Sequence, residues 1–123
     1  MSYTTARKRA VGLGSAKSGT EHYWKTIQSS VGLLILVPLF IFTFGSILGS
    51  SYEEVIAYYS RPFPAIVAAL TIAVGWLHFK NGAQVLLEDY FRGMTYKVSL
   101  IVVNCISYAA LVAGLYALVR LAL

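Results

Sequence analysis

The sequence predicts an all-α membrane protein with three transmembrane helices. Hydrophobic residues make up 58% of the 123 residues and charged residues only 12%, and the mean hydropathy is +0.68. These values exclude a disordered chain and disfavour a soluble domain. Each of three long apolar runs is near the ~20 residues that a helix needs to cross the bilayer core. Because lipid offers the backbone no hydrogen bonds, such runs are expected to be helical.

The chain divides into a basic N-terminal segment, residues 1–30, and a three-helix transmembrane domain, residues 31–123. The expected spans are residues 31–49, 63–87 and 98–119. The connector 50–62 is predicted to form a short amphipathic helix on the outer surface. Cys105 lies inside the third apolar run and is interpreted as a buried small apolar residue.

The basic residues indicate the orientation of the chain. Those that precede the first apolar run are Arg7, Lys8, Arg9, Lys17 and Lys25. Arg92 and Lys97 follow the second span, whereas the connector between the first two spans holds only Arg61. The positive-inside rule therefore places the N-terminus inside and, after three spans, the C-terminus outside. This distribution favours a membrane-orienting segment over a nucleic-acid-binding tail.

The predicted location is the inner, or cytoplasmic, membrane of a bacterium. No cleavable signal peptide is apparent, since the first apolar run is too long for a signal core. Residues 1–20 are basic, rich in Ser and Gly, and free of acids. That composition is also typical of a short organellar transit peptide, so the mitochondrial inner membrane is the less favoured alternative.

His78 lies in the second span, where an imidazole is costly and usually functional. On a helix of 100° per residue, Thr71, Gly75 and Gly82 fall within about 60° of His78 and form one stripe with it. Small residues let a flat group or another helix approach closely, and neutral histidine binds metals. With a histidine among these small residues, the stripe is compatible with a haem face. Helix packing through the glycines and an interhelical hydrogen bond from His78 are equally open interpretations at this point.

A haem iron with two axial ligands needs two such side chains. The chain has one other histidine, His22, and it precedes the first apolar run. If His78 binds haem, the second ligand is therefore expected from another chain. Lys80 falls about 200° from His78 on the helix. It is predicted to snorkel, or to pair with a neighbouring chain, and not to contact a cofactor held by His78.

Glu88, Asp89 and Tyr90 follow His78 near the end of the same helix, with Tyr90 ~18 Å along the axis if the helix continues. They are expected at the inner membrane surface, where they can form a polar binding site. The simpler interpretation of the two acids is a solvated helix end, and that of the tyrosine is an anchor at the membrane interface. No hydrolase, phosphate-loop, zinc or flavin motif occurs in the sequence, so the chain is not expected to be an enzyme on its own.

Three spans with the spacing His78-x10-Asp89-Tyr90 resemble the smaller hydrophobic membrane-anchor subunit of succinate dehydrogenase, respiratory complex II. The stretch GLGSAKSGTEHYW resembles the alphaproteobacterial members. The resemblance implies that His78 is an axial ligand of a haem b shared with the larger cytochrome b anchor subunit. It implies that Tyr90 hydrogen-bonds the ubiquinone head group, and that Asp89 supports this site by pairing with an arginine of the other anchor.

The resemblance further implies a non-catalytic anchor that packs with the second anchor subunit and links the tricarboxylic acid cycle to respiratory electron transport. The iron–sulfur and flavoprotein subunits are the other expected partners, and neither a flavin nor an iron–sulfur cluster is expected in this chain. Many relatives have an arginine near the haem propionates, for which Lys25 or Gln28 would substitute here. The alternative function is a cofactor-free structural or assembly subunit of another membrane complex.

Overall fold

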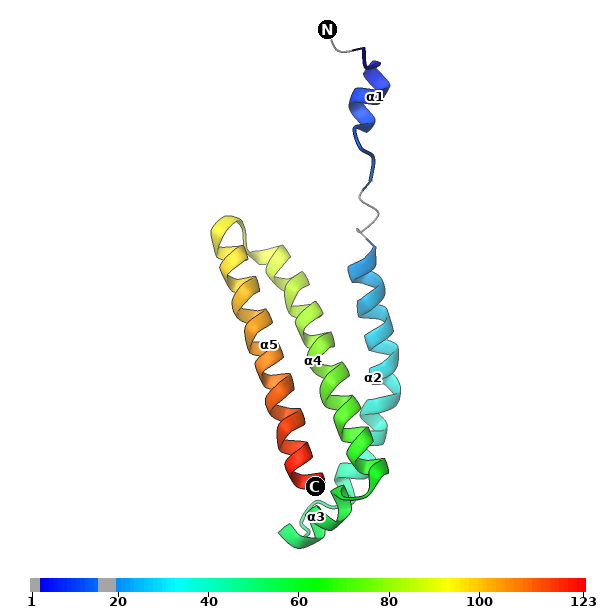
Figure 1. Cartoon of the computed structure of the whole chain (residues 1–123), viewed down its shortest axis with the longest axis vertical. Coiled ribbons are helices and arrows are strands. Elements are labelled where there is room, and N and C mark those ends of the chain that lie inside the picture. The colour runs from blue at the N-terminus through cyan, green and yellow to red at the C-terminus, as the bar shows by residue number, and fades with distance from the viewer. Residues whose placement is uncertain (1–2, 16–19) are drawn as a thin grey trace.

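The computed structural model describes residues 3–15 and 20–123, and every regular element in this part of the chain is a helix (Figure 1). The helices are α1 (Ala6–Val11), α2 (Glu21–Gly45), α3 (Tyr52–Tyr59), α4 (Pro62–Tyr90) and α5 (Gly93–Ala122). The predicted all-α fold is confirmed. Lys17, one of the basic residues that indicate the orientation, lies outside the described residues.

Helices α2, α4 and α5 are long and apolar enough to cross a membrane, with 25, 29 and 30 residues. The three predicted transmembrane helices are thereby confirmed. All three helices extend into polar sequence beyond the apolar runs, and α2 already begins at Glu21. At its other end α2 stops at Gly45 instead of continuing to Gly49. Residues 46–49 form turns, and Gly49 has a φ of +85°, which ends any helix there.

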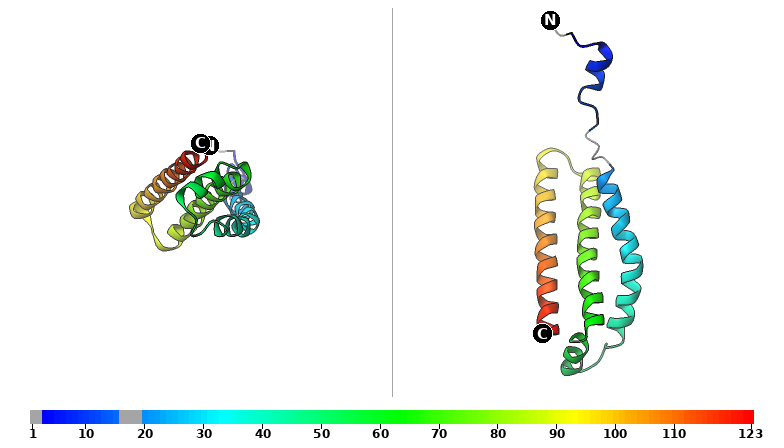
Figure 2. Two further views of the ribbon diagram at one scale, coloured as in Figure 1. Left: turned by 90° about the horizontal axis from the view of Figure 1, so that it is seen from below. Right: turned by 45° about the vertical axis from the view of Figure 1, so that its right-hand side comes forward.

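The three long helices run antiparallel to their chain neighbours, with α4 between α2 and α5 (Figures 1 and 2). Among the described residues, α4 contacts both α2 and α5, whereas α2 and α5 do not contact each other. The bundle is therefore an open layer of helices and not a closed three-helix core. Helix α1 lies apart from this layer (Figure 1).

Helix α3 lies across one end of the layer and contacts both α4 and α5 (Figure 2). It begins with a capping box, in which Ser51 Oγ accepts a hydrogen bond from the Glu54 backbone N–H and Glu54 Oε2 accepts one from the Ser51 N–H. The short helix predicted in this connector is therefore present.

The end of the layer that α3 covers is called the α3 end below. The opposite end, where α2 begins, α4 ends and α5 begins, is called the Tyr90 end.

The buried apolar core is small and lies at the α3 end. Its members are Ile47, Tyr59, Ala68 and Leu118. Close packing of α5 on α4 continues this core, because Gly114 has no side chain and a Cβ there would lie 3.2 Å from Ile72 Cγ2. A small residue is thus needed at this crossing.

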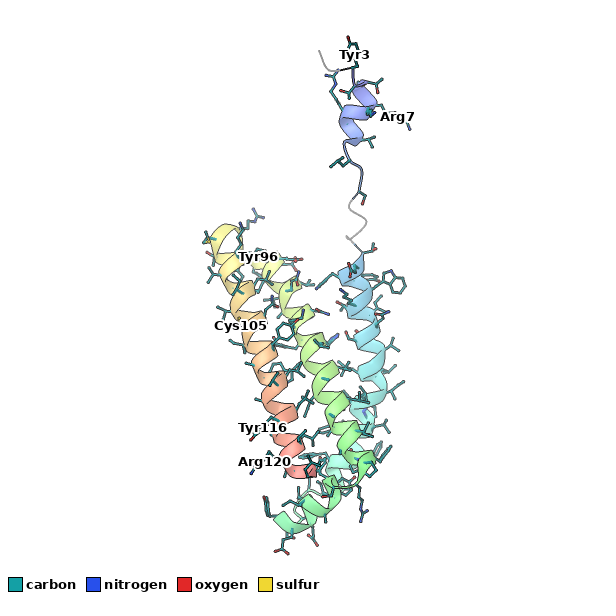
Figure 3. The ribbon with its side chains drawn as sticks, viewed as in Figure 1. Tyr3, Arg7, Tyr96, Cys105, Tyr116 and Arg120 are labelled. Carbon is teal, nitrogen blue, oxygen red and sulfur yellow. The ribbon has the colours of Figure 1, made fainter. Side chains whose placement is uncertain are left out.

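Most of the apolar surface of the long helices is not covered by this chain. In the most apolar stretch of α2 no residue is buried, and side chains such as Leu34, Ile101 and Val112 are more than half exposed. Cys105 on α5 is also exposed (Figure 3), so its interpretation as a buried residue is wrong within this chain. Since α4 is the one long helix beside α5 in the described residues, most of the circumference of α5 faces outward.

We expect Gly114→Val to destabilise the packing of α5 on α4 by about 1–3 kcal/mol, the usual cost of overfilling a packed site. The new side chain would meet Ile72. The measurement is the thermal unfolding temperature of the assembled complex in detergent. Gly45→Val is the matched control, because a Cβ at Gly45 meets nothing within 4 Å. Equal unfolding temperatures for the two variants would contradict this packing.

Candidate functional site

His78 lies just past the middle of α4 and is half-buried where α4 contacts α2. Its Nδ1 atom is 2.9 Å from Ser29 Oγ, which belongs to α2. The interhelical hydrogen bond that the sequence left open as an alternative is therefore present. It uses one of the two ring nitrogens, so it does not exclude a ligand role for the other.

Ser29 was not identified from the sequence as a partner of His78. On α2, His22, Thr26 and Ser29 recur at intervals of four and three residues, and all three are half-buried. This spacing places them on one helix face, and it is the signal that predicts a polar side of α2 directed at α4. Ser29 Oγ also donates a hydrogen bond to the Thr26 carbonyl oxygen at 2.8 Å.

The stripe next to His78 faces away from the packing of this chain. A Cβ added to Gly75 or Gly82 meets nothing within 4 Å, whereas one added to Gly32 meets Val74 Cγ1 at 3.6 Å. Gly32 therefore borders the packing of α2 on α4, whereas the space beside Gly75 and Gly82 is open within the described residues. Thr71 satisfies its own hydroxyl by donating to the Val67 carbonyl oxygen at 2.7 Å.

A shallow depression of ≈ 240 Å³ runs along this open side of α4. The residues that line it are Thr71, Ile72, Gly75, Trp76 and Phe79. Trp76 and Phe79 form an edge-to-face pair with ring centroids 5.5 Å apart. The open side of α4 thus combines glycine, which has no side chain, with two aromatic rings, and a flat apolar group fits such a surface.

Asp89 and Tyr90 occupy the last turn of α4, so the helix does continue to Tyr90 as expected. The Tyr90 side chain is 79% exposed. Glu88 accepts hydrogen bonds from Gln84 Nε2 at 2.9 Å and from the Tyr96 hydroxyl at 3.2 Å. Figure 3 shows Tyr96 at this end of α5, beside the end of α4. Glu88 therefore fastens α5 to α4, and Tyr90 is left available to groups outside the chain.

Two depressions lie between α2 and α4 toward the Tyr90 end. The first, of ≈ 360 Å³, includes His22, whose Nε2 atom is buried and has no hydrogen-bond partner among the described residues. The second, of ≈ 400 Å³, includes Lys25 and Gln28. Lys25 Nζ is 2.7 Å from Glu21 Oε1, and both side chains are well exposed. The two residues considered as substitutes for an arginine therefore line one depression, whose surface is mainly apolar.

Lys80 has a partner that the sequence did not predict. Its Nζ atom lies 5.6 Å from the centre of the Tyr108 ring on α5. Snorkelling or pairing with a neighbouring chain was expected, and the contact found within the described residues is with the third long helix of the same chain. The antiparallel pairing of α4 with α5 brings Tyr108 within reach of Lys80.

The comparisons with known proteins agree with this arrangement. Residues 1–119 match the family described as the succinate dehydrogenase/fumarate reductase transmembrane subunit. The chain is also 43% identical over 123 residues to the succinate dehydrogenase hydrophobic membrane anchor subunit of Paracoccus denitrificans, an alignment that covers 100% of this chain and 95% of the relative. No solved structure matches the chain significantly.

The protein is therefore a multi-pass membrane protein with three spanning helices. It belongs to the family of succinate dehydrogenase/fumarate reductase transmembrane subunits.

We expect Gly75→Leu to lower the amount of assembled complex several-fold while leaving the helices of this chain unchanged. The added side chain meets nothing in the chain itself, so any loss reports a group that approaches the stripe from outside. The measurement is the yield of complex after co-expression with the other subunits. Gly45→Leu adds the same bulk at another open helical glycine, and equal yields for the two variants would argue against a stripe that is approached closely.

Proposed function

We propose that this chain is the hydrophobic membrane anchor subunit of a succinate:ubiquinone oxidoreductase. The observation that carries the proposal is the position of His78 and Tyr90 on one unbroken helix, α4, in a chain that matches the family over almost its whole length. The full-length similarity to a succinate dehydrogenase anchor of a bacterium supports the choice of reaction. In this proposal the chain has no catalytic residue and holds the acceptors of electrons delivered by the soluble subunits.

The proposed orientation has the Tyr90 end at the cytoplasmic face of the bacterial inner membrane. Arg7, Lys8 and Arg9 in α1 and Lys25 at the start of α2 belong to this end, together with Arg92 beside the end of α4. Positive charge near the ends of spans favours the cytoplasmic side. The soluble iron–sulfur and flavoprotein subunits would then dock at the Tyr90 end.

The larger anchor subunit is the proposed partner within the membrane. Large apolar side chains remain exposed along α2, α4 and α5, and the three helices form an open layer. The stripe of Gly75 and Gly82 lies on this open layer and has unused space beside it. Helices in lipid associate through such small residues, so a second set of helices would complete the bundle there.

The residues present fit a haem b held jointly by two chains. His78 would supply one axial ligand, and Gly75 and Gly82 leave the room that a Cβ would otherwise fill. Trp76 and Phe79 offer ring faces and edges beside Gly75. Haem, when bound, supplies a one-electron redox centre. The contribution of this chain would be to hold the iron through a neutral imidazole and to exclude water from that face.

Tyr90 and Asp89 form the proposed contribution to the quinone site. The exposed Tyr90 hydroxyl can donate a hydrogen bond to a quinone carbonyl and thereby favour the negative charge that reduction places on that oxygen. Asp89, in the same exposed turn, is proposed to pair with an arginine of the other anchor subunit.

A cofactor-free structural subunit is the second candidate. The observation in its favour is the hydrogen bond between His78 and Ser29, which satisfies one ring nitrogen inside this chain. A buried polar side chain with such a bond is stable without any metal. The two candidates differ in whether the haem spectrum of the complex depends on His78.

We expect His78→Ala to change the haem spectrum of the purified complex and to shift its reduction potential, because one axial ligand is removed. The measurement is a reduced-minus-oxidised absorption spectrum together with a redox titration. Tyr90→Phe serves as the control, since it leaves the proposed ligand in place. A spectrum and a potential that are both unchanged in His78→Ala would rule out the ligand role and favour the cofactor-free candidate.

We expect Tyr90→Phe to reduce succinate–quinone turnover selectively. In strong sites of this type, loss of one hydrogen-bond donor to a developing negative charge raises the activation free energy by about 2.7–4 kcal/mol. This range is the upper limit for the effect expected here. Succinate oxidation with a dye that accepts electrons before the quinone should persist, because the soluble subunits are intact.

Tyr23→Phe is the matched control for Tyr90→Phe, because Tyr23 is another exposed tyrosine at the same end of the bundle. Its quinone turnover should equal that of the unmodified complex. Normal quinone turnover in an assembled Tyr90→Phe complex would disprove the quinone role. Equal loss of the quinone and dye activities would indicate disturbed assembly instead.

A further inference from the structure

We propose that Ser29 is the positioning residue of His78. It accepts a hydrogen bond from the Nδ1–H group of the imidazole and so leaves the Nε2 atom unprotonated and free to bind the haem iron. This inference rests on the proposed function, because it takes His78 as the ligand. It assigns to α2 the control of the tautomer, the ring orientation and the electron donation of a ligand carried by α4.

The proton of the Ser29 hydroxyl determines the direction of this hydrogen bond. Ser29 Oγ lies 2.8 Å from the Thr26 carbonyl oxygen and 2.9 Å from His78 Nδ1. A carbonyl oxygen only accepts, and a hydroxyl has a single proton, so the proton between the two oxygens belongs to Ser29. The lone pair of Oγ then faces the imidazole, and Nδ1 must carry the other proton.

The reverse direction is unfavourable. If the Ser29 hydroxyl turned its proton toward Nδ1, two acceptor oxygens would remain 2.8 Å apart with no hydrogen between them. The Thr26 carbonyl already accepts a second hydroxyl, from Ser30 at 2.9 Å, but that bond does not relieve the repulsion between the two oxygens. The neutral imidazole is therefore the Nδ1–H tautomer, whose lone pair is on Nε2.

The packing of α2 on α4 maintains this short contact. Gly32 is one turn from Ser29 on α2, and Val74 is one turn from His78 on α4. A Cβ on Gly32 would lie 3.6 Å from Val74 Cγ1, an ordinary van der Waals distance, so α2 and α4 pack against each other at this crossing. This packing keeps the serine side chain within reach of the imidazole. Both Ser29 and His78 are half-buried, which strengthens the hydrogen bond relative to one in water.

Such a bond has a chemical effect beyond orientation. An imidazole that donates its second N–H is a more basic ligand, and histidines that bind metals almost always make this donation. A more basic ligand stabilises the oxidised iron relative to the reduced iron, which lowers the reduction potential. A serine that only joined two helices would influence stability and leave the potential unchanged.

The test is Ser29→Ala in the assembled complex, with the haem b potential measured by redox titration of the absorption spectrum. We expect a positive shift of the potential, together with altered g values of the oxidised haem in electron paramagnetic resonance. Ser29→Thr retains a hydroxyl and should restore both values. Ser30→Ala is the matched control, because Ser30 also donates to the Thr26 carbonyl but is exposed, and the hydroxyl bonded to His78 is that of Ser29.

Unchanged potential and g values in Ser29→Ala would overturn the inference, as would a Ser29→Thr complex that shifts as far as Ser29→Ala. If Ser29→Ala prevents assembly, Ser29→Cys decides the question. Its thiol is a weaker acceptor of similar size, so a positive shift supports the inference and an unchanged potential overturns it.

The His78→Ala complex separates this inference from the function on which it rests. An unchanged haem spectrum in His78→Ala means that His78 is not the ligand, and the proposed function then fails first. A changed spectrum in His78→Ala combined with an unchanged potential in Ser29→Ala refutes the role of Ser29 alone.

Discussion

The packing of α4 between α2 and α5 is the interaction on which the rest of the structure depends. Within the described residues, no other long helix contacts two long neighbours. Lipid tails are as apolar as the side chains, so burial from water does not drive these helices together. Van der Waals packing on both sides of α4 supplies the contact instead, and at Gly114 it is so tight that a Cβ would lie 3.2 Å from Ile72 Cγ2.

Stability and chemistry are separated along the length of the layer. The cluster of buried apolar residues lies at the α3 end, where α3 covers the ends of the long helices. Toward the Tyr90 end the contacts between α2 and α4 become polar and include His78 and Ser29. A bundle with its apolar cluster at one end can place costly polar groups toward the other.

The features that follow from local sequence were predictable. Hydropathy predicts three helices, and the 100° step predicts the stripe of Gly75, His78 and Gly82, because neither depends on how the helices pack. The contact of Ser29 with His78 was not predictable in the same way, since it requires the rotation of α2 about its own axis relative to α4. The ring partner of Lys80 and the exposure of Cys105 depend likewise on the side of α4 that α5 occupies.

The connection between α4 and α5 consists of Phe91 and Arg92 alone, and α5 starts at Gly93 with a φ of +61°. A backbone this short cannot absorb an inserted residue without rotating α5, because each added residue turns a helix by about 100°. The segment before α2 carries no such restriction, because α1 lies apart from the layer. Natural variation in chain length should therefore accumulate ahead of α2 and be rare at the corner beside Tyr90.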